Sequence, residues 1–232
     1  MVAKTLSRRF VLQSLAAGVA AASHTLSFSS ASRSVPVSKA EGAFIIHNDL
    51  PWALETRRSQ FGFGPITAAS HLFVRNNLPA PPASLTDQGD DWSFEVVGCA
   101  REGSLTLADL KRMKSRTVAT VLQCSGNGRD FFPHDPSGSQ WGVGAAGCVL
   151  WTGVSVADIF EQFGGVQPGL AYLTATGGEE LPEGIDQDAV VVERSVPIEK
   201  GLKDCLLVWE MNGAPLPVIH GGPVRLVVPG YF

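Results

Sequence analysis

Charged residues are scarce in this sequence, and no part of it is rich in basic ones. Asp, Glu, Lys and Arg together make up 17% of the 232 residues, which is low for a cytosolic domain, and the formal net charge is −4. Proteins that bind nucleic acids usually carry a concentrated patch of Lys and Arg. The lack of such a tract argues against a nucleic-acid partner.

The sequence also lacks the cysteine and histidine spacings of a zinc site. Its four cysteines, Cys99, Cys124, Cys148 and Cys205, include no Cys-x-x-Cys pair. Three of them, Cys99, Cys148 and Cys205, lie in apolar, strand-like surroundings. These surroundings favour packing in the core, although the wide spacing also permits disulfides. Cys124 differs from the others in the residues that follow it.

The N-terminal apolar stretch is too short to form a stable membrane span. Residues 11–22 are apolar but rich in Ala and Gly, and a membrane-spanning helix needs about 20 apolar residues. The paired arginines Arg8 and Arg9 precede this stretch and resemble a twin-arginine export signal. We therefore predict a signal peptide over 1–22 and a periplasmic protein, with an ordinary secretory signal or a short anchor as the alternative. Residues 23–42, rich in Ser and Ala, are predicted to be a disordered linker.

The composition indicates one sizeable core with many loops. Hydrophobic residues make up 44% of the chain, beside 25 Gly and 15 Pro. Thr106 and Ser155 are suited to begin short helices as N-caps. The segment 43–67 has no clear period and is predicted to be irregular, with Glu55 as a solvated charge. The predicted strands are 72–74, 92–98, 116–123, 170–176, 205–210 and 226–228, and the predicted helices are 106–113, 155–163 and 200–204.

Residues 121–129 contain the most informative motif. The apolar run 118–122 predicts a buried strand that leads to Cys124, and small residues then turn the chain. Arg129 follows five positions after the cysteine, and its guanidinium favours a thiolate and suits an oxyanion. The same pattern fits a free cysteine buried at the end of a strand, and this stretch alone leaves both interpretations open.

Three further segments place polar or small residues where a ligand could bind. Residues 75–77 (Arg-Asn-Asn) follow the predicted strand 72–74, where they suit either phosphate recognition or turn formation. His220 and Arg225 flank a Gly-Gly-Pro turn and can both donate to a phosphate, or can instead cap a turn and lie on a strand face. The small residues of 141–148 allow close backbone approach, either to another strand or to a ligand.

Together these segments resemble the sulfite oxidase family of molybdopterin enzymes. The motif Leu-Gln-Cys-Ser-Gly-Asn-x-Arg is similar to the cysteine loop of that family, and the segments around Arg75 and His220 match further family motifs in the same order. The resemblance covers about 43–232. It implies an α+β molybdopterin-binding catalytic domain with mixed β-sheets and short helices, and a molybdenum-molybdopterin cofactor.

The resemblance also implies roles for individual residues. Cys124 would be the metal ligand, and Arg75 and Arg129 would complete the catalytic site as a cationic pocket for an oxyanion. Asn77 stands where the best-known members have His, which departs from the family pattern. The implied cofactor-binding residues are Arg75, Asn76, Asn77, Cys124, Asp186, His220 and Arg225.

The activity that the resemblance implies is oxidation of sulfite to sulfate, with electrons passed to a c-type cytochrome. Sulfane dehydrogenation and reduction of an S- or N-oxide are alternatives on the same scaffold. The family continues past the position of Phe232 with an active-site tyrosine and an immunoglobulin-like dimerisation domain, and we expect this chain to lack both. A truncated, non-catalytic remnant is therefore a further alternative, and the homodimer of the family is expected to be weakened.

Overall fold

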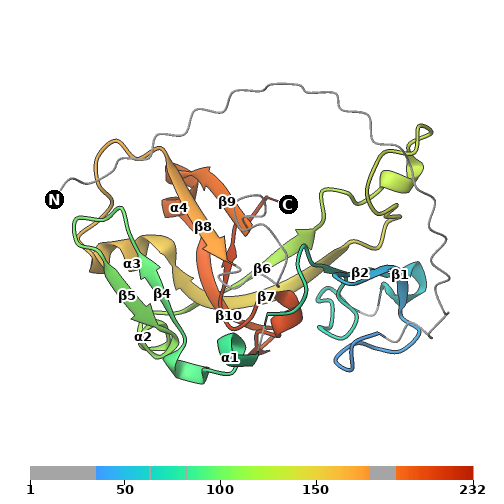
Figure 1. Cartoon of the computed structure of the whole chain (residues 1–232), viewed down its shortest axis with the longest axis horizontal. Helices are drawn as coiled ribbons and strands as arrows, with labels where there is room; N and C mark the ends of the chain where they lie inside the picture. Colours follow the sequence, from blue (N-terminus) through green and yellow to red (C-terminus); the bar gives the residue numbers. More distant parts are fainter. Residues whose placement is uncertain (1–34, 63, 82, 178–191, 232) are drawn as a thin grey trace, which may run out of the picture. The chain divides into compact units, whose positions relative to one another are not determined.

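The structure is a computed structural model that describes residues 35–62, 64–81, 83–177 and 192–231 (Figure 1). These residues belong to one unit, Arg33–Phe232. The predicted signal peptide over 1–22 and the predicted cofactor contact Asp186 lie outside the described residues. None of the helices that the structure describes is long and apolar enough to cross a membrane.

A five-stranded antiparallel sheet carries the main core (Figure 1). One of its strands, β7, pairs with β6 on one side and with β10 on the other, and β10 also pairs with β11 and β12. The dipeptide Asn212-Gly213, which is a strong signal of a hairpin turn, joins β10 to β11, and Asn212 has a φ of 56°. The strands of this sheet are β6 (Arg116–Gln123), β7 (Ala146–Ser155), β10 (Leu206–Met211), β11 (Ala214–Pro215) and β12 (Arg225–Val227).

Strand β7 is buried over most of its length. Val149, Trp151 and Val154 are fully shielded from solvent, and burying each valine contributes about 1.5–3 kcal/mol. Gly153 lets β10 come close, because an added Cβ would lie 2.1 Å from the Leu207 carbonyl oxygen. The sheet therefore has a tightly packed centre next to which β6 and the loop after it are fixed.

Strand β6 is an edge strand, which corrects the buried strand expected from the sequence. Its residues alternate between exposed and half-buried, and Val121 is 55% exposed. Among the described strands, β6 pairs with β7 alone. An apolar run is typical of both central and half-covered strands, so only the sheet order reveals which one this is.

The segment 43–67, predicted to be irregular, instead contains a β-hairpin. Strand β1 (Phe44–Asp49) pairs antiparallel with β2 (Trp52–Thr56), and β3 (Val74–Arg75) pairs with the other edge of β2. A β-bulge in β1 interrupts the register. Because the bulge breaks the even alternation of apolar and polar residues, a search for a period of two misses this hairpin.

The predicted helices 106–113, 155–163 and 200–204 and the predicted strands 92–98 and 170–176 are present with small shifts of their ends, and the α+β fold class is confirmed. The sequence did not predict strand β7, the short helix 83–86, the strands 103–106 and 192–197, or the 3-10 helices. Thr106 caps α2 (Leu107–Arg112) through a capping box, in which its Oγ1 accepts from the Asp109 amide at 3.1 Å. In return Asp109 Oδ2 accepts from the Thr106 hydroxyl at 2.7 Å and from the Thr106 amide at 2.8 Å, and these two hydrogen bonds lower the pKa of Asp109. The other elements are α1 (Ala83–Thr86), β4 (Ser93–Val96), β5 (Gly103–Thr106), α3 (Val156–Gln162), β8 (Tyr172–Gly177), β9 (Val192–Pro197), α4 (Ile198–Asp204) and the 3-10 helices η1 (Arg58–Gln60), η2 (Gly89–Asp91), η3 (Arg129–Phe131) and η4 (Val218–His220).

Residues 35–42, which the sequence assigned to a disordered linker, pack against the domain. Lys39 is only 6% exposed, and the Ala40 amide donates to the Ser70 carbonyl at 3.0 Å. The ordered domain thus includes the last part of the predicted linker. The composition of the segment does not predict this packing, because a Ser- and Ala-rich segment has the same composition whether its lysine is buried or exposed.

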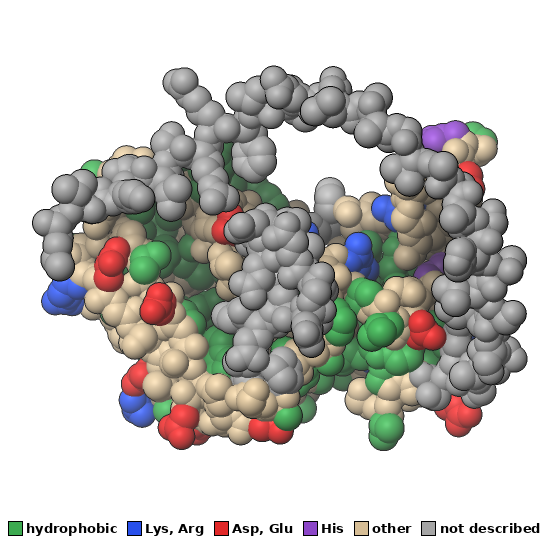
Figure 2. Space-filling view, viewed as in Figure 1, with side chains coloured by type: hydrophobic (Ala, Val, Ile, Leu, Met, Phe, Trp, Pro, Cys, Tyr) green, Lys and Arg blue, Asp and Glu red, His purple; other side chains and the backbone are tan. Residues whose placement is uncertain are grey.

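Charged side chains are scattered over the face of the molecule shown in Figure 2. Several are paired at the surface, as Lys111 is with Asp90 and Arg116 with Asp158. Such exposed pairs contribute little stability, typically about 0–1 kcal/mol. The polar groups that matter for the site are therefore the buried ones.

Candidate active site

The loop after β6 presents the thiol of Cys124. The Cys124 amide donates to the Ala145 carbonyl at 2.9 Å, and the Cys124 carbonyl accepts from the Asn127 amide at 2.9 Å. These two bonds turn the chain sharply at the cysteine. The Gly126 amide also donates to Cys124 Sγ at 3.4 Å, so a backbone N–H points at the sulfur. The side chain is half-buried and packs against the main core cluster, which contains Trp141.

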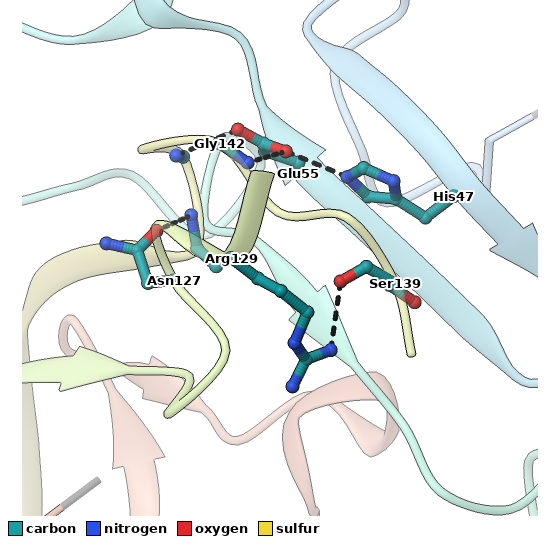
Figure 3. A network of polar contacts seen from close by, with 8 residues as sticks. His47, Glu55, Asn127, Arg129, Ser139 and Gly142 are labelled. Atoms are coloured by element: carbon teal, nitrogen blue, oxygen red, sulfur yellow. Dashed lines mark hydrogen bonds and ion pairs between the residues drawn. The ribbon is translucent and has the colours of Figure 1, made fainter. Parts of the chain in front are cut away.

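A second segment, 141–145, runs alongside this loop and fixes it. The Gly128 amide donates to the Gly142 carbonyl at 2.7 Å, and the Asp130 amide donates to the Trp141 carbonyl at 3.0 Å. Asn127 Oδ1 accepts from the Ala145 amide at 2.9 Å (Figure 3). The cysteine loop is thus held at Cys124 and at the residues after it by hydrogen bonds to one neighbouring segment.

Glu55 anchors that neighbouring segment, which corrects its assignment as a solvated charge. Glu55 is only 4% exposed. Its carboxylate accepts hydrogen bonds from the Gly142 amide at 2.9 Å and from the Gly144 amide at 3.0 Å. His47 Nε2 lies 2.8 Å from Glu55 Oε2 (Figure 3). A buried carboxylate is tolerated when hydrogen bonds replace its water shell, and here three partners do so. The residues next to Glu55 in the sequence do not distinguish it from an exposed acidic residue.

The glycines of 141–145 are required by this packing. An added Cβ at Gly142 would lie 2.8 Å from Glu55 Oε1, and one at Gly144 would lie 1.9 Å from the Thr56 carbonyl oxygen. The Thr56 amide in turn donates to the Gly144 carbonyl at 3.3 Å. Of the two possibilities raised by the sequence, these two glycines serve close approach to strand β2.

A cavity of about 160 Å³ opens beside the cysteine loop, and Arg129 forms part of its wall. The guanidinium is half-buried, and its Nη1 donates to the Ser139 carbonyl at 2.9 Å (Figure 3). That carbonyl is its one acceptor among the described residues, so further N–H groups remain for an anion. The cavity is lined by Ser125, Gly126, Asn127, Arg129, Phe132, His134 and Pro136.

Arg75 lies at the exposed end of β3 and contacts its own neighbours. It donates to the Asn76 carbonyl at 3.2 Å and to the side-chain oxygen of Asn77. No hydrogen bond or ion pair in the described part of the chain joins it to Cys124 or Arg129. In the structure Arg75 therefore contacts Asn76 and Asn77. The catalytic roles of Arg75, Cys124 and Arg129 stay predictions.

His220 and Arg225 meet in a buried group that also contains Lys39. Lys39 Nζ lies 2.7 Å from His220 Nε2, and Arg225 Nη1 donates to the His220 carbonyl at 3.0 Å. The Arg225 guanidinium also lies over the ring of Trp151, 5.4 Å from its centroid. Lys39 was missed in the sequence, because it precedes the recognised motifs by many residues and has no patterned neighbour.

Burial suppresses the positive charge of this group. Burial, together with the charges of Lys39 and Arg225, lowers the pKa of His220 to about 3. Burial likewise lowers the pKa of Lys39 to about 7, and it lowers the pKa of Arg225. His220 is therefore a neutral imidazole at physiological pH, beside the Arg225 guanidinium and a Lys39 side chain whose pKa lies near neutrality.

A family model described as an oxidoreductase molybdopterin binding domain matches residues 79–232. The chain belongs to this family. It is 34% identical to the mitochondrial sulfite oxidase of Rattus norvegicus, over 71% of this chain and 30% of that protein. It is also 33% identical to the mitochondrial sulfite oxidase of Drosophila melanogaster, over 68% of this chain and 27% of that protein.

The chain is also similar to a nitrate reductase in sequence and to a further solved structure in fold. The NADPH nitrate reductase of Neurospora crassa is 30% identical over 73% of this chain and 19% of that protein. The crystal structure of the sulfane dehydrogenase SoxCD from Paracoccus pantotrophus shares the fold with a TM-score of 0.63 at 24% identity, covering 83% of this chain and 46% of that chain. The chain spans about a third of the length of the sulfite oxidases and a smaller share of the nitrate reductase.

The molybdopterin-family residues of this chain fit an anionic cofactor. The group around His220 has a surplus of hydrogen-bond donors: Arg225 has five N–H groups and one acceptor among the described residues. The indole Nε1 of Trp151 is buried and has no acceptor in the part of the chain that the structure describes. Such donors call for an acceptor such as a phosphate, which molybdopterin carries.

Cys124 fits the role of a single protein ligand to the metal. In the described residues, no three His, Cys, Asp or Glu side chains are grouped so that they could bind a metal ion by themselves. The family resemblance implies that the other sulfur ligands of the metal would come from the dithiolene of molybdopterin. A soft thiolate is a suitable ligand for a redox metal of this kind.

Replacing Glu55 by Gln is expected to destabilise the fold by about 2 kcal/mol. An amide keeps the size but offers one acceptor oxygen in place of two, so a buried Gly142 or Gly144 amide loses its partner. Chemical denaturation measures the loss. Glu199→Gln, at an exposed position, is the matched control and should change stability by less than about 0.5 kcal/mol. Equal stability of the two variants would contradict this role of Glu55.

The depressed pKa of His220 predicts a loss of stability in acid. The unfolded chain binds a proton near pH 6.5, whereas folded His220 does so only near pH 3. Its contribution is therefore complete above pH 6.5 and decreases as the pH falls, by about 1–2 kcal/mol between pH 6.5 and 5. Denaturation at both pH values should show this slope in the wild type and lose it in His220→Gln. The exposed His134→Gln should keep the wild-type slope, and a wild-type slope in His220→Gln would refute the prediction.

Proposed function

We propose that this protein is a molybdenum-cofactor oxidoreductase that oxidises sulfite to sulfate and passes the electrons to a c-type cytochrome. The observation that carries the proposal is the position of the Cys124 thiol in a rigid loop that also lines a small cavity containing Arg129. The sequence similarity to sulfite oxidases supports the same choice.

Each part of the site has a distinct task in this proposal. Cys124 would bind the molybdenum through Sγ, and His220 and Arg225 would donate to the anionic end of the cofactor. When bound, the cofactor supplies the two-electron redox chemistry and the oxygen-atom transfer. The backbone N–H of Gly126 holds the sulfur in one direction, and the hydrogen bonds to 141–145 keep the loop from moving.

The cavity beside the loop is suited to a small anion. Its volume of about 160 Å³ is sufficient for a small anion such as sulfite. Arg129 supplies charge-assisted hydrogen bonds from N–H groups that Ser139 does not occupy. We propose Arg75 as the second cation that attracts the substrate.

We further propose that the protein acts in the periplasm. The paired Arg8 and Arg9 before the short apolar stretch 11–22 support export by the twin-arginine route, which carries folded proteins. That route suits a protein that receives its cofactor before export. A c-type cytochrome in the same compartment would accept the electrons.

A different substrate on the same scaffold is the second candidate. Asn77 replaces the family's histidine and accepts from Arg75, so the substrate-side arginine is held differently from the pattern that the resemblance implies. The reaction catalysed would then be sulfane dehydrogenation or the reduction of an S- or N-oxide. Steady-state reduction of an artificial acceptor with sulfite, compared with sulfane sulfur as the donor, separates the oxidations. Oxidation of a reduced dye by S- or N-oxides tests the reverse direction.

The variant Cys124→Ser is expected to lose molybdenum and activity but to keep the fold. A hydroxyl is a poor ligand for this metal, and we expect sulfite-dependent turnover to fall at least about 100-fold. Elemental analysis for molybdenum, steady-state kinetics and circular dichroism measure the three properties. Cys148→Ser, at another half-buried cysteine, is the matched control and should keep both metal and turnover. Activity that survives in Cys124→Ser would remove the central assignment.

A further inference from the structure

Lys39 is a buried lysine for which the cysteine site provides no explanation. Its Nζ lies 2.6 Å from the Ala69 carbonyl oxygen, 2.8 Å from the Leu72 carbonyl oxygen and 2.7 Å from His220 Nε2. No carboxylate pairs with it among the described residues. The ring of Phe44 lies 5.8 Å from the ammonium nitrogen, which further favours a cation there.

The three neighbours of Lys39 match the three hydrogens of an ammonium group. Two of them are carbonyl oxygens, which can only accept, so they take two of the N–H bonds. The third hydrogen then points at His220 Nε2, which must act as an acceptor. A neutral imidazole whose Nε2 accepts carries its proton on Nδ1.

The lysine also connects two segments that hold predicted cofactor contacts. Ala69 and Leu72 precede Arg75 in the chain, and His220 precedes Arg225. Both segments lie within hydrogen-bond distance of the Lys39 Nζ atom. The position of Lys39 therefore determines both the proton on the His220 ring and the spacing between the two segments.

We propose that Lys39 is a positioning residue that holds His220 in the neutral Nδ1–H tautomer and so directs the imidazole donor toward the anionic cofactor. The hydrogen bond from Arg225 to the His220 carbonyl fixes the backbone of the same residue. Arg225 keeps further N–H groups, and the buried Trp151 Nε1 has no acceptor among the described residues. The part of this inference that concerns the cofactor rests on the proposed function, whereas the part that concerns the tautomer does not.

A rival arrangement uses a neutral lysine. An amine would donate its two hydrogens to Ala69 and Leu72 and accept from an Nε2–H of His220, so all the groups would again be paired. The two arrangements differ by one proton and by the tautomer of His220. At pH 6 the ammonium predominates, since burial lowers the pKa of Lys39 to about 7, and His220 is neutral, since its pKa is about 3.

The first test is nitrogen-15 NMR of the histidine rings at pH 6 on the full chain. The wild type is expected to show His220 with a bare Nε2 and a proton on Nδ1, assigned with the His220→Gln variant. In Lys39→Met the donor to Nε2 is lost, so Nε2 no longer has to remain an unprotonated acceptor and the proton should move to it. An Nε2–H tautomer in the wild type, or an unchanged tautomer in Lys39→Met, overturns the proposal.

The second test measures retention of the cofactor. Lys39→Met is expected to release molybdenum about 10-fold faster than the wild type during dialysis, because a displaced supporting residue typically costs 10–100-fold in affinity. A variant that changes tautomer but retains molybdenum as the wild type does refutes the positioning role. If the wild type itself holds no molybdenum under cofactor-producing conditions, the proposed function fails, while the NMR result still decides whether Lys39 sets the ring.

Lys200→Met is the matched control for both tests. Lys200 is also partly buried, donates to Asp204 and to the Pro229 carbonyl, and lies over the ring of Tyr231. It has no contact with His220 among the described residues. This variant should leave the His220 tautomer and the rate of molybdenum release unchanged, and an equal effect in both variants would show that the loss of any such lysine is sufficient.

Discussion

The buried carboxylate of Glu55 is the interaction on which the cysteine site depends. The loop that carries Cys124 has no regular structure of its own and is held by hydrogen bonds to 141–145. That segment is held in turn by the two oxygens of Glu55, which accept from two of its amides. Loss of this carboxylate would leave buried N–H groups unpaired on the segment beside the thiol, at a cost of about 1–3 kcal/mol for each group.

Two buried polar centres with opposite character thus organise the site. The centre at Glu55 is complete, because its negative charge is matched by backbone amides and His47. The centre at Lys39, His220 and Arg225 has more donors than acceptors and no carboxylate among its described partners. A complete centre serves as a scaffold, whereas one with surplus donors among the described residues is suited to bind an anion, since an anionic ligand supplies acceptors.

The local patterns of the sequence predicted the elements well where a single rule governs them. The capping box at Thr106 and the hairpin at Asn212-Gly213 are set by neighbouring residues, and both are present. The β1–β2 hairpin was missed because its bulge breaks the period of two. The edge position of β6 was also missed, because an apolar run has the same composition in a central strand and in an edge strand.

The sequence by itself determined the family, the α+β class and the cysteine loop, because these depend on residues close together in the chain. The tertiary structure alone decided which charged residues are buried. Glu55 lies 87 positions from Gly142, and Lys39 lies 181 positions from His220. A carboxylate or an ammonium is stable inside a protein only when the fold brings distant partners to it, and no pattern of neighbouring residues records such a partner.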